Sequence, residues 1–132
     1  MPAKARDVKY LKSPLQAPYA LKDAFSWGTF VRYLELGEDS FALRQVDEYE
    51  NGFLTRYDRD HWQDQFGSLA DFRWGESWIA HWGEPSLVSK DSFEEKWAAA
   101  ELSKPFAIRH TLPSGRPPWI VLFESGKWRG QA

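Results

Sequence analysis

The chain contains no cysteine, only one methionine and no long apolar run. The absence of cysteine excludes disulfide bonds, thiolate nucleophiles and zinc sites built from thiolates. The apolar runs fall short of the roughly 18 residues of a membrane-spanning helix, so we expect no membrane as a partner. The N-terminal segment MPAKARDVKYLKS is basic and lacks the apolar stretch of a signal peptide, so we expect a soluble cytoplasmic protein.

Aromatic side chains, by contrast, are abundant. The chain has eight Trp, five Tyr and nine Phe, which together make up 17% of its residues, and 42% of the chain is hydrophobic. This composition excludes wholesale disorder, and the length is sufficient for one domain with a real core. Rings packed on both faces of a small sheet account for the excess. Exposed rings that stack on sugars or bases are the alternative.

The strongest local signal is the dipeptide Asn51-Gly52, which separates two extended runs, FALRQVDEYE and FLTRYD. A two-residue type I′ turn needs a positive φ at both central positions, and Asn and Gly tolerate that conformation. This turn predicts a register that places Asp47 directly opposite Arg56, where the opposite charges attract. With the run FVRYLEL upstream, three consecutive antiparallel strands are expected.

The upstream hairpin is predicted from a four-residue loop between FVRYLEL and FALRQV. A regular loop of this length places Leu34 opposite Leu43 and Arg44 opposite Tyr33. An arginine in the middle of a strand can stack on an aromatic ring and pair with a carboxylate in bidentate geometry. We therefore expect Arg44 to act as a strap over one face of the sheet.

The clearest helix signal is the segment SKDSFEEKWAAAEL. Ser89 is a good N-cap, and the acidic residues that follow it suit the helix dipole. Phe93, Trp97 and Ala100 recur at helical spacing and form one apolar stripe, and Pro105 ends the pattern. We expect this helix to pack on the sheet through Phe93 and Trp97.

The remaining segments predict further strands and loops. SWIAHW (77–82) alternates in hydropathy and predicts a fourth strand, while FAIRH and WIVLFES predict a final pair of strands. Residues 58–76 lack a clean period and predict a loop or a short helix. Residues 14–25 mix prolines with apolar residues, which predicts an irregular arm or short helix against the sheet.

The fold class that these elements predict is α+β, with an antiparallel sheet of about five or six strands and one principal helix packed on it. We expect a single domain over residues 1–132. Within it, residues 1–13 form a flexible basic lead, residues 30–100 the core, and residues 101–132 a C-terminal strand extension.

Charge is unevenly distributed along the chain, although the net charge is only −2 at pH 7. Residues 1–34 carry six basic and two acidic groups, whereas residues 35–64 carry nine acidic and three basic groups. An acidic surface steers basic partners and disfavours nucleic acid, since phosphate binding needs the opposite sign. A solvated acidic face without a partner is the alternative. The acidic residues concerned are Glu35, Glu38, Asp39, Asp47, Glu48, Glu50, Asp58, Asp60 and Asp64.

The hairpin carries the pattern E-L-aromatic-x-x-R-x-V-acid-x-aromatic-x-N/D-G, and the helix carries I/V-S-x-x-x-F-E-x-x-W. The positions are Glu35, Leu36, Phe41, Arg44, Val46, Asp47, Tyr49, Asn51, Gly52, Val88, Ser89, Phe93, Glu94 and Trp97. Together these motifs resemble a small bacterial domain family of unknown function over residues 30–100. Families of this kind look like the small proteins found beside secreted toxins, so the resemblance implies an immunity role. It brings no catalytic residues, and the N-terminal arm and the C-terminal extension fall outside it.

The densest polar cluster follows the predicted third strand and contains Asp58, Asp60, His61 and Asp64. Carboxylates and imidazole are ligands for divalent metals, so a metal-assisted phosphohydrolase or nuclease is one interpretation. The spacing matches neither an EF-hand nor a two-histidine zinc motif, and a solvated loop is the alternative. We therefore predict no catalytic residue, metal or cofactor, and favour a protein that is not an enzyme.

The favoured function is a protein-binding module that offers the acidic hairpin region and nearby aromatic residues to a basic protein partner. An immunity protein that inhibits a toxin domain is its most concrete form. Acidic residues would steer association, and tryptophans would anchor it. The predicted partner-binding residues are Glu48, Glu50, Asp58, Asp60, Asp64, Trp62 and Trp74. A small-molecule or carbohydrate binder lined by Trp62, Trp74, Trp78 and Trp82 is a further alternative.

Overall fold

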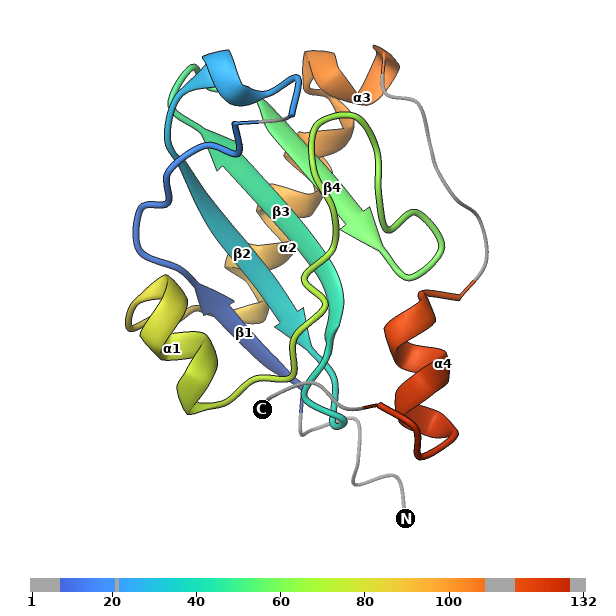
Figure 1. The fold of residues 1–132 in the computed structure, drawn as a ribbon. Helices are drawn as coiled ribbons and strands as arrows, with labels where there is room; N and C mark the ends of the chain where they lie inside the picture. The colour runs from blue at the N-terminus through green and yellow to red at the C-terminus, as the bar shows by residue number, and fades with distance from the viewer. Residues whose placement is uncertain (1–7, 21, 109–115, 129–132) are drawn as a thin grey trace.

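The computed structural model describes residues 8–20, 22–108 and 116–128, apart from the side chains of residues 76 and 77. It shows an α+β fold, with a five-stranded antiparallel sheet of order β4-β3-β2-β1-β5 and helices packed on it (Figure 1). The strands are β1 Lys9–Lys12, β2 Phe30–Leu36, β3 Ala42–Tyr49, β4 Leu54–Asp58 and β5 Ser86–Leu87. The helices are the short 3-10 helix η2 Phe25–Trp27, α1 Glu76–Trp82, α2 Lys90–Glu101, α3 Lys104–Ile108 and α4 Pro118–Glu124. The predicted fold class is confirmed.

Two layers cover the two faces of the sheet. Helix α2 lies behind the sheet in Figure 1, while the chain between β4 and α1 crosses in front of it. On the α2 side, Tyr33 and Val46 pack with the fully buried Phe93 and Ala100 of the helix. On the opposite side, the larger core cluster contains Leu11, Leu34, Leu36, Ala42, Tyr57, Leu69, Ala70 and Trp78. Both faces are therefore apolar near the centre of the sheet.

The principal helix forms where the sequence predicts it. The Ser89 side chain accepts a hydrogen bond from the amide of Ser92, which caps the first turn of α2. Phe93 and Trp97 stack with ring centroids 6.2 Å apart, and together with Ala100 they face the sheet. The helix ends at Glu101, and Pro105 lies inside the separate helix α3.

The turn at Asn51-Gly52 forms, but its predicted register is wrong by one residue. Of the two turn residues, Gly52 has a positive φ, of 93°, and Asn51 does not. The Asn51 side chain instead accepts a hydrogen bond from the Phe53 amide. The loop is therefore longer than two residues, since the Tyr49 amide bonds to the Phe53 carbonyl. As a result Thr55, and not Arg56, lies opposite Asp47.

The register of the β2–β3 hairpin also differs from the prediction, by two residues. Leu34 lies opposite Gln45, and Arg44 lies opposite Glu35, with an irregularity between Glu35 and Leu36. This register places Arg32 directly opposite Asp47 on the face away from α2. A buried ion pair between these two side chains is the feature that the sequence pattern did not reveal.

Three segments predicted as strands are helices. Trp78 and Trp82 alternate with neighbours as in a strand, but they are also four residues apart, and their rings stack at 5.7 Å on one side of α1. In α4 a proline occupies the first turn, where its fixed φ favours a helix start. The predicted C-terminal strand extension is thus replaced by α3 and α4 within the described residues, and residues 109–115 lie outside them.

The N-terminal segment also departs from the prediction. Residues 9–12 of the predicted flexible lead form β1, a sheet strand between β2 and β5, while residues 1–7 lie outside the described part. The chain then continues as an irregular arm, residues 13–19. It bonds to β2 through a bridge between Gln16 and Phe30 and through Ser13, whose amide donates to the Arg32 carbonyl and whose hydroxyl accepts the Arg32 amide. In Figure 1 this arm runs in blue from β1 toward η2. The prediction of an arm against the sheet is confirmed.

Candidate functional site

Asp47 pairs with Arg32 in the interior of the protein. Their side chains are 0% and 2% exposed, with Nε to Oδ1 at 2.9 Å and Nη2 to Oδ2 at 3.2 Å. Burial by itself lowers the pKa of Arg32, but the Asp47 carboxylate outweighs it and raises that pKa above its usual value. The pair is therefore ionic and structural, and Asp47 adds no charge to the surface.

Arg44 forms the predicted strap over the α2 face, with different rings from the one expected. Its guanidinium bonds to Glu35 at 2.7 and 2.9 Å and to Glu94 of α2 at 2.6 Å. It lies 4.9 Å from the ring centroids of both Phe93 and Trp97. Glu35 is thereby neutralised, and α2 is tied to the sheet by a charge-assisted contact.

The carboxylates of the cluster at residues 58–64 form hydrogen bonds that stabilise the loop itself. Asp58 Oδ1 accepts the amides of Asp60 at 2.9 Å and His61 at 2.8 Å. Asp64 is buried and accepts the Tyr57 hydroxyl at 2.8 Å together with backbone amides. No group of three or more His, Asp or Glu side chains that would suit a metal ion occurs in the described part of the chain. These side chains are not brought together as the metal-assisted alternative requires.

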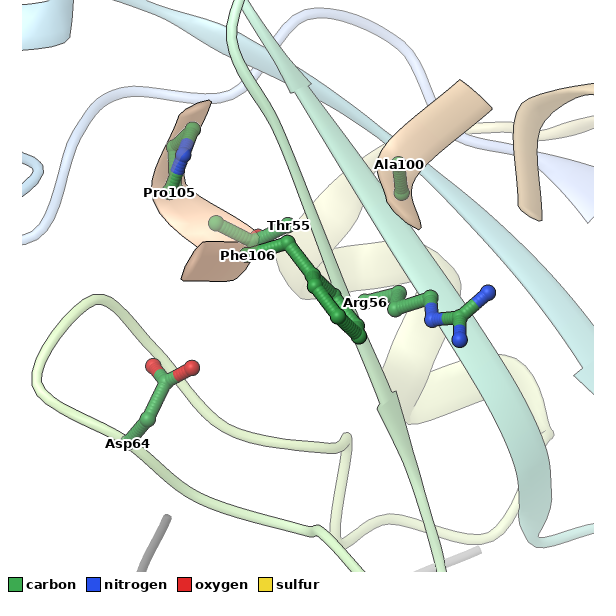
Figure 2. Close-up of a pocket in the computed structure, with 6 residues that line it drawn as sticks. All are labelled: Thr55, Arg56, Asp64, Ala100, Pro105 and Phe106. Atoms are coloured by element: carbon green, nitrogen blue, oxygen red, sulfur yellow. The ribbon is translucent and has the colours of Figure 1, made fainter. Parts of the chain in front are cut away.

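A crevice beside Asp64 has no catalytic geometry either (Figure 2). Figure 2 shows the Asp64 carboxylate on one side of β4, and the Arg56 guanidinium on the other side, pointing away from Asp64. Arg56 lies 4.5 Å from the ring centroid of Trp97 and 5.0 Å from that of Phe106. The crevice is too narrow to hold a water molecule, so it is part of the packing between β4, α2 and α3. Its lining residues are Thr55, Arg56, Asp64, Ala100, Pro105 and Phe106.

The tryptophans predicted as anchors are half-buried. Trp62 packs edge-on against Trp119 of α4 at 5.2 Å, and Trp74 packs edge-on against Trp78 at 4.8 Å. Both lie against the larger core cluster. They are thus part of the protein's own packing, and Trp78 is 3% exposed.

Glu48 and Glu50 are the predicted partner-binding residues that the structure brings together. They line an open depression of about 400 Å³ at the end of β3, which we call the acidic hollow. Its walls combine the two carboxylates with apolar side chains from the arm and from β2. The residues that line it are Leu15, Thr29, Val31, Glu48, Tyr49 and Glu50.

Local backbone geometry fixes Glu50 at the rim of the acidic hollow. Its amide donates to the Thr29 carbonyl at 2.8 Å, and its Oε1 accepts the Thr29 amide at 3.2 Å and hydroxyl at 3.3 Å. Gly28 has a φ of 93°, and a Cβ at this position would collide with the Glu50 carboxylate. The glycine is therefore required by both its backbone conformation and this close approach.

The two carboxylates of the acidic hollow differ in their electrostatics. Glu48 pairs with Lys96 of α2 at 3.0 Å and accepts the Tyr33 hydroxyl at 3.3 Å. Burial lowers the pKa of Lys96, but the hydrogen bond and charge of Glu48 more than offset this, so the net shift is upward. Within the described residues Glu50 forms no ion pair, and its partners on Thr29 are neutral. The uncompensated charge of the hollow is therefore that of Glu50.

The sequence predicted Glu48 and Glu50 as partner-binding residues, but it did not predict the apolar residues that line the acidic hollow. Leu15 is 67% exposed, and it lies in the arm between two prolines, PLQAP. Val31 lies directly opposite Glu48 in the β2–β3 register, which the sequence predicted incorrectly. The prolines around Leu15 predict an arm, but no signal in the sequence places this leucine beside the two carboxylates.

Comparison with protein-family models, with curated proteins and with solved structures finds no match. The resemblance to a small bacterial domain family therefore remains a prediction. In the described residues, no helix combines the length and the apolarity needed to cross a membrane. The fold and the hollow together define a small α+β protein with an acidic, partly apolar surface depression.

Proposed function

We propose that this is a cytoplasmic protein-binding module whose acidic hollow receives a lysine or arginine side chain of a basic protein partner. The observation that carries the proposal is the Glu50 carboxylate, which forms no ion pair with another described residue and lies at the rim of a hollow with apolar walls. The methylene stem of a basic side chain would lie on Leu15 and Val31 while its charge meets Glu50. Arginine would in addition form a bidentate contact.

The proposal involves fewer partner-binding residues than the sequence predicted. Glu48, Asp58 and Asp64 are engaged within the protein, and Trp62 and Trp74 are packed. Asp60 is exposed but lies outside the acidic hollow, so Glu50 is the principal charged contact that the hollow offers. A single rim charge acts mainly on the association rate and on its salt dependence. The burial of Leu15 would supply the apolar part of the affinity.

The most concrete partner that we propose is a toxin domain, which this protein would inhibit. A toxin that acts on nucleic acid needs a basic substrate site because it binds phosphate. An acidic protein module is complementary to such a site. Support for this partner comes from this charge complementarity and from the sequence resemblance described above.

The test uses a displayed library of random peptides selected on the immobilised full-length chain at low salt. We expect the selected peptides to be enriched in Lys and Arg, and their binding to weaken as salt rises. In the Glu50→Gln variant this enrichment should disappear. Glu84→Gln removes the same charge from an exposed position outside the hollow and should leave the enrichment unchanged.

Two outcomes would overturn the proposal. One is the absence of basic enrichment in peptides selected on the native chain. The other is an enrichment that persists in Glu50→Gln, since the basic residues would then be bound elsewhere. Circular dichroism of both variants checks that each is folded.

A further inference from the structure

A second depression lies on the other side of the arm from the acidic hollow. Leu15 lines the acidic hollow, while the next two residues of the arm line the second depression, which measures about 260 Å³. We call it the aromatic hollow, because four of its seven lining residues carry aromatic rings other than histidine. The lining residues are Gln16, Ala17, Tyr19, Phe30, Phe72, His81 and Trp82.

The walls of the aromatic hollow are held from beneath by the buried Arg32. Its guanidinium carbon lies 4.6 Å from the Trp82 ring centroid, 5.3 Å from that of Phe30 and 5.9 Å from that of Tyr19. The Gln16 amide group donates to the Trp82 carbonyl at 2.8 Å, which ties the arm to the end of α1. The hollow is thus shaped before any ligand arrives, which lowers the entropic cost of binding.

Tyr19 and Gln16 offer one hydrogen-bond donor and one acceptor to the aromatic hollow, which the imidazole of His81 also lines. The Tyr19 hydroxyl accepts a hydrogen bond from Arg32 Nη2 at 3.2 Å, so its own hydrogen can be donated to a ligand. The Gln16 nitrogen donates to the carbonyls of Pro14 and Trp82, which leaves its amide oxygen as the acceptor. No aspartate, glutamate, lysine or arginine lines the hollow. Such a surface suits an uncharged ligand with hydroxyl groups.

The ring geometry discriminates between ligand shapes. Phe72 and Trp82 meet at 69° with centroids 6.4 Å apart, so they form a corner and not a parallel slot for a planar base. Phe72 and Tyr19 are 43% and 38% exposed, and each offers ring surface to solvent. A sugar ring needs only one stacking surface for its apolar face, and its hydroxyls then reach polar groups at the side. A cationic ligand is disfavoured, because Arg32 already occupies the inner side of these rings.

We propose that the aromatic hollow binds one uncharged hexose ring, with Phe72 as the stacking surface and Tyr19 and Gln16 as its hydrogen-bonding partners. The volume is below the roughly 300–1,000 Å³ of pockets for drug-sized ligands, which limits the occupant to a single ring. This site is separate from the acidic hollow and does not depend on the function proposed for it.

The test is an NMR titration of the isotope-labelled full chain with the methyl glycosides of glucose, galactose and mannose. At least one should shift the signals of Trp82 and Tyr19 saturably, with a dissociation constant on the order of 10 mM, as expected for a small ligand with few contacts. Phe72→Ala and Gln16→Leu should each weaken binding by about tenfold or more. Leu102→Ala, which truncates an 89%-exposed apolar side chain outside the hollow, should leave it unchanged.

Further ligands decide between chemical classes. Glucosamine, which is cationic, should bind more weakly than the uncharged glycosides. The proposal is overturned if no glycoside produces saturable shifts, if adenosine or p-cresol binds the hollow in preference to all three glycosides, or if Phe72→Ala binds as the native chain does. Glu50→Gln should retain glycoside binding whether or not it abolishes peptide enrichment, so the two proposals fail independently.

Discussion

Replacing one member of the buried Arg32–Asp47 pair is expected to destabilise the protein strongly. The two charges are 2.9 Å apart and at most 2% exposed, so water cannot substitute for a missing partner. At an effective dielectric constant of about 20, their attraction is about 6 kcal/mol, and desolvation of both ions cancels much of it. Removing a single partner leaves an uncompensated buried charge, which typically costs about 3–5 kcal/mol. That cost is a large part of the free energy of unfolding of a whole domain, which is roughly 5–15 kcal/mol.

The double-mutant cycle consists of Arg32→Met, Asp47→Leu and the combined variant. Met in place of Arg32 would lie against the rings of Trp82 and Phe30, which now contact the guanidinium. The combined variant removes both charges, so it should recover most of the stability that each single variant loses. We expect a coupling free energy of about 3 kcal/mol or more, measured by urea unfolding followed through tryptophan fluorescence.

A surface pair provides the matched comparison. Lys96 and Glu48 are 3.0 Å apart, but their side chains are 30% and 34% exposed. The cycle of Lys96→Met and Glu48→Leu should therefore give a coupling below about 1 kcal/mol. If the losses at Arg32 and Asp47 are additive, or if either single variant costs less than about 1 kcal/mol, the ionic interpretation of the buried pair is refuted.

Two further predictions concern tyrosine ionisation and a glycine. Burial raises the pKa of every tyrosine above its usual value of 10.0, that of Tyr10 to about 12. The folded state thus holds these protons more tightly than the unfolded chain, so stability is complete below pH 10 and lost as pH rises through about 12. Ultraviolet absorbance that shows tyrosinate in the folded protein at pH 10 would contradict this. Gly28 and Gly52 both have a φ of 93°, but only Gly28 lies against Glu50. Gly28→Ala should therefore lower the free energy of unfolding in urea more than Gly52→Ala does. It should also abolish the enrichment of basic peptides. Equal losses would mean that the close approach to Glu50 has no consequence.

Local signals were sufficient for α2 and for the position of the second hairpin turn. Ser89 and the stripe from Phe93 to Ala100 are contained within a dozen residues, and no distant contact competes with them. The six residues of SWIAHW were ambiguous, because Trp78 and Trp82 fit both a period of two and a spacing of four. Such a short segment takes the structure that buries Trp78, and this depends on the core of the sheet.

Strand register could not be predicted because it depends on contacts between distant residues. The sequence favoured a local charge pair between Asp47 and Arg56, whereas the fold places Asp47 opposite Arg32. A slip of one residue changes which face of the sheet a side chain occupies. The predicted register therefore placed Arg56 on the same face as Asp47, whereas Arg56 packs against Trp97 of α2 on the other face. The apolar walls of the acidic hollow were missed for the same reason, since Val31 meets Glu48 only in the true register.

The acidic excess of residues 35–64 shows why the net charge of a segment is a poor guide to its surface. Arg32 neutralises Asp47 from the preceding strand, and Lys96 neutralises Glu48 from a helix 48 residues further along the chain. Both cations lie outside residues 35–64, so the net charge of that segment does not include them. Glu50 differs because its partners are the neutral amide and hydroxyl of Thr29, which orient the carboxylate without cancelling its charge. A carboxylate held by neutral donors at an open rim keeps its full charge for a partner, so Glu50 is where substitution should separate binding from folding.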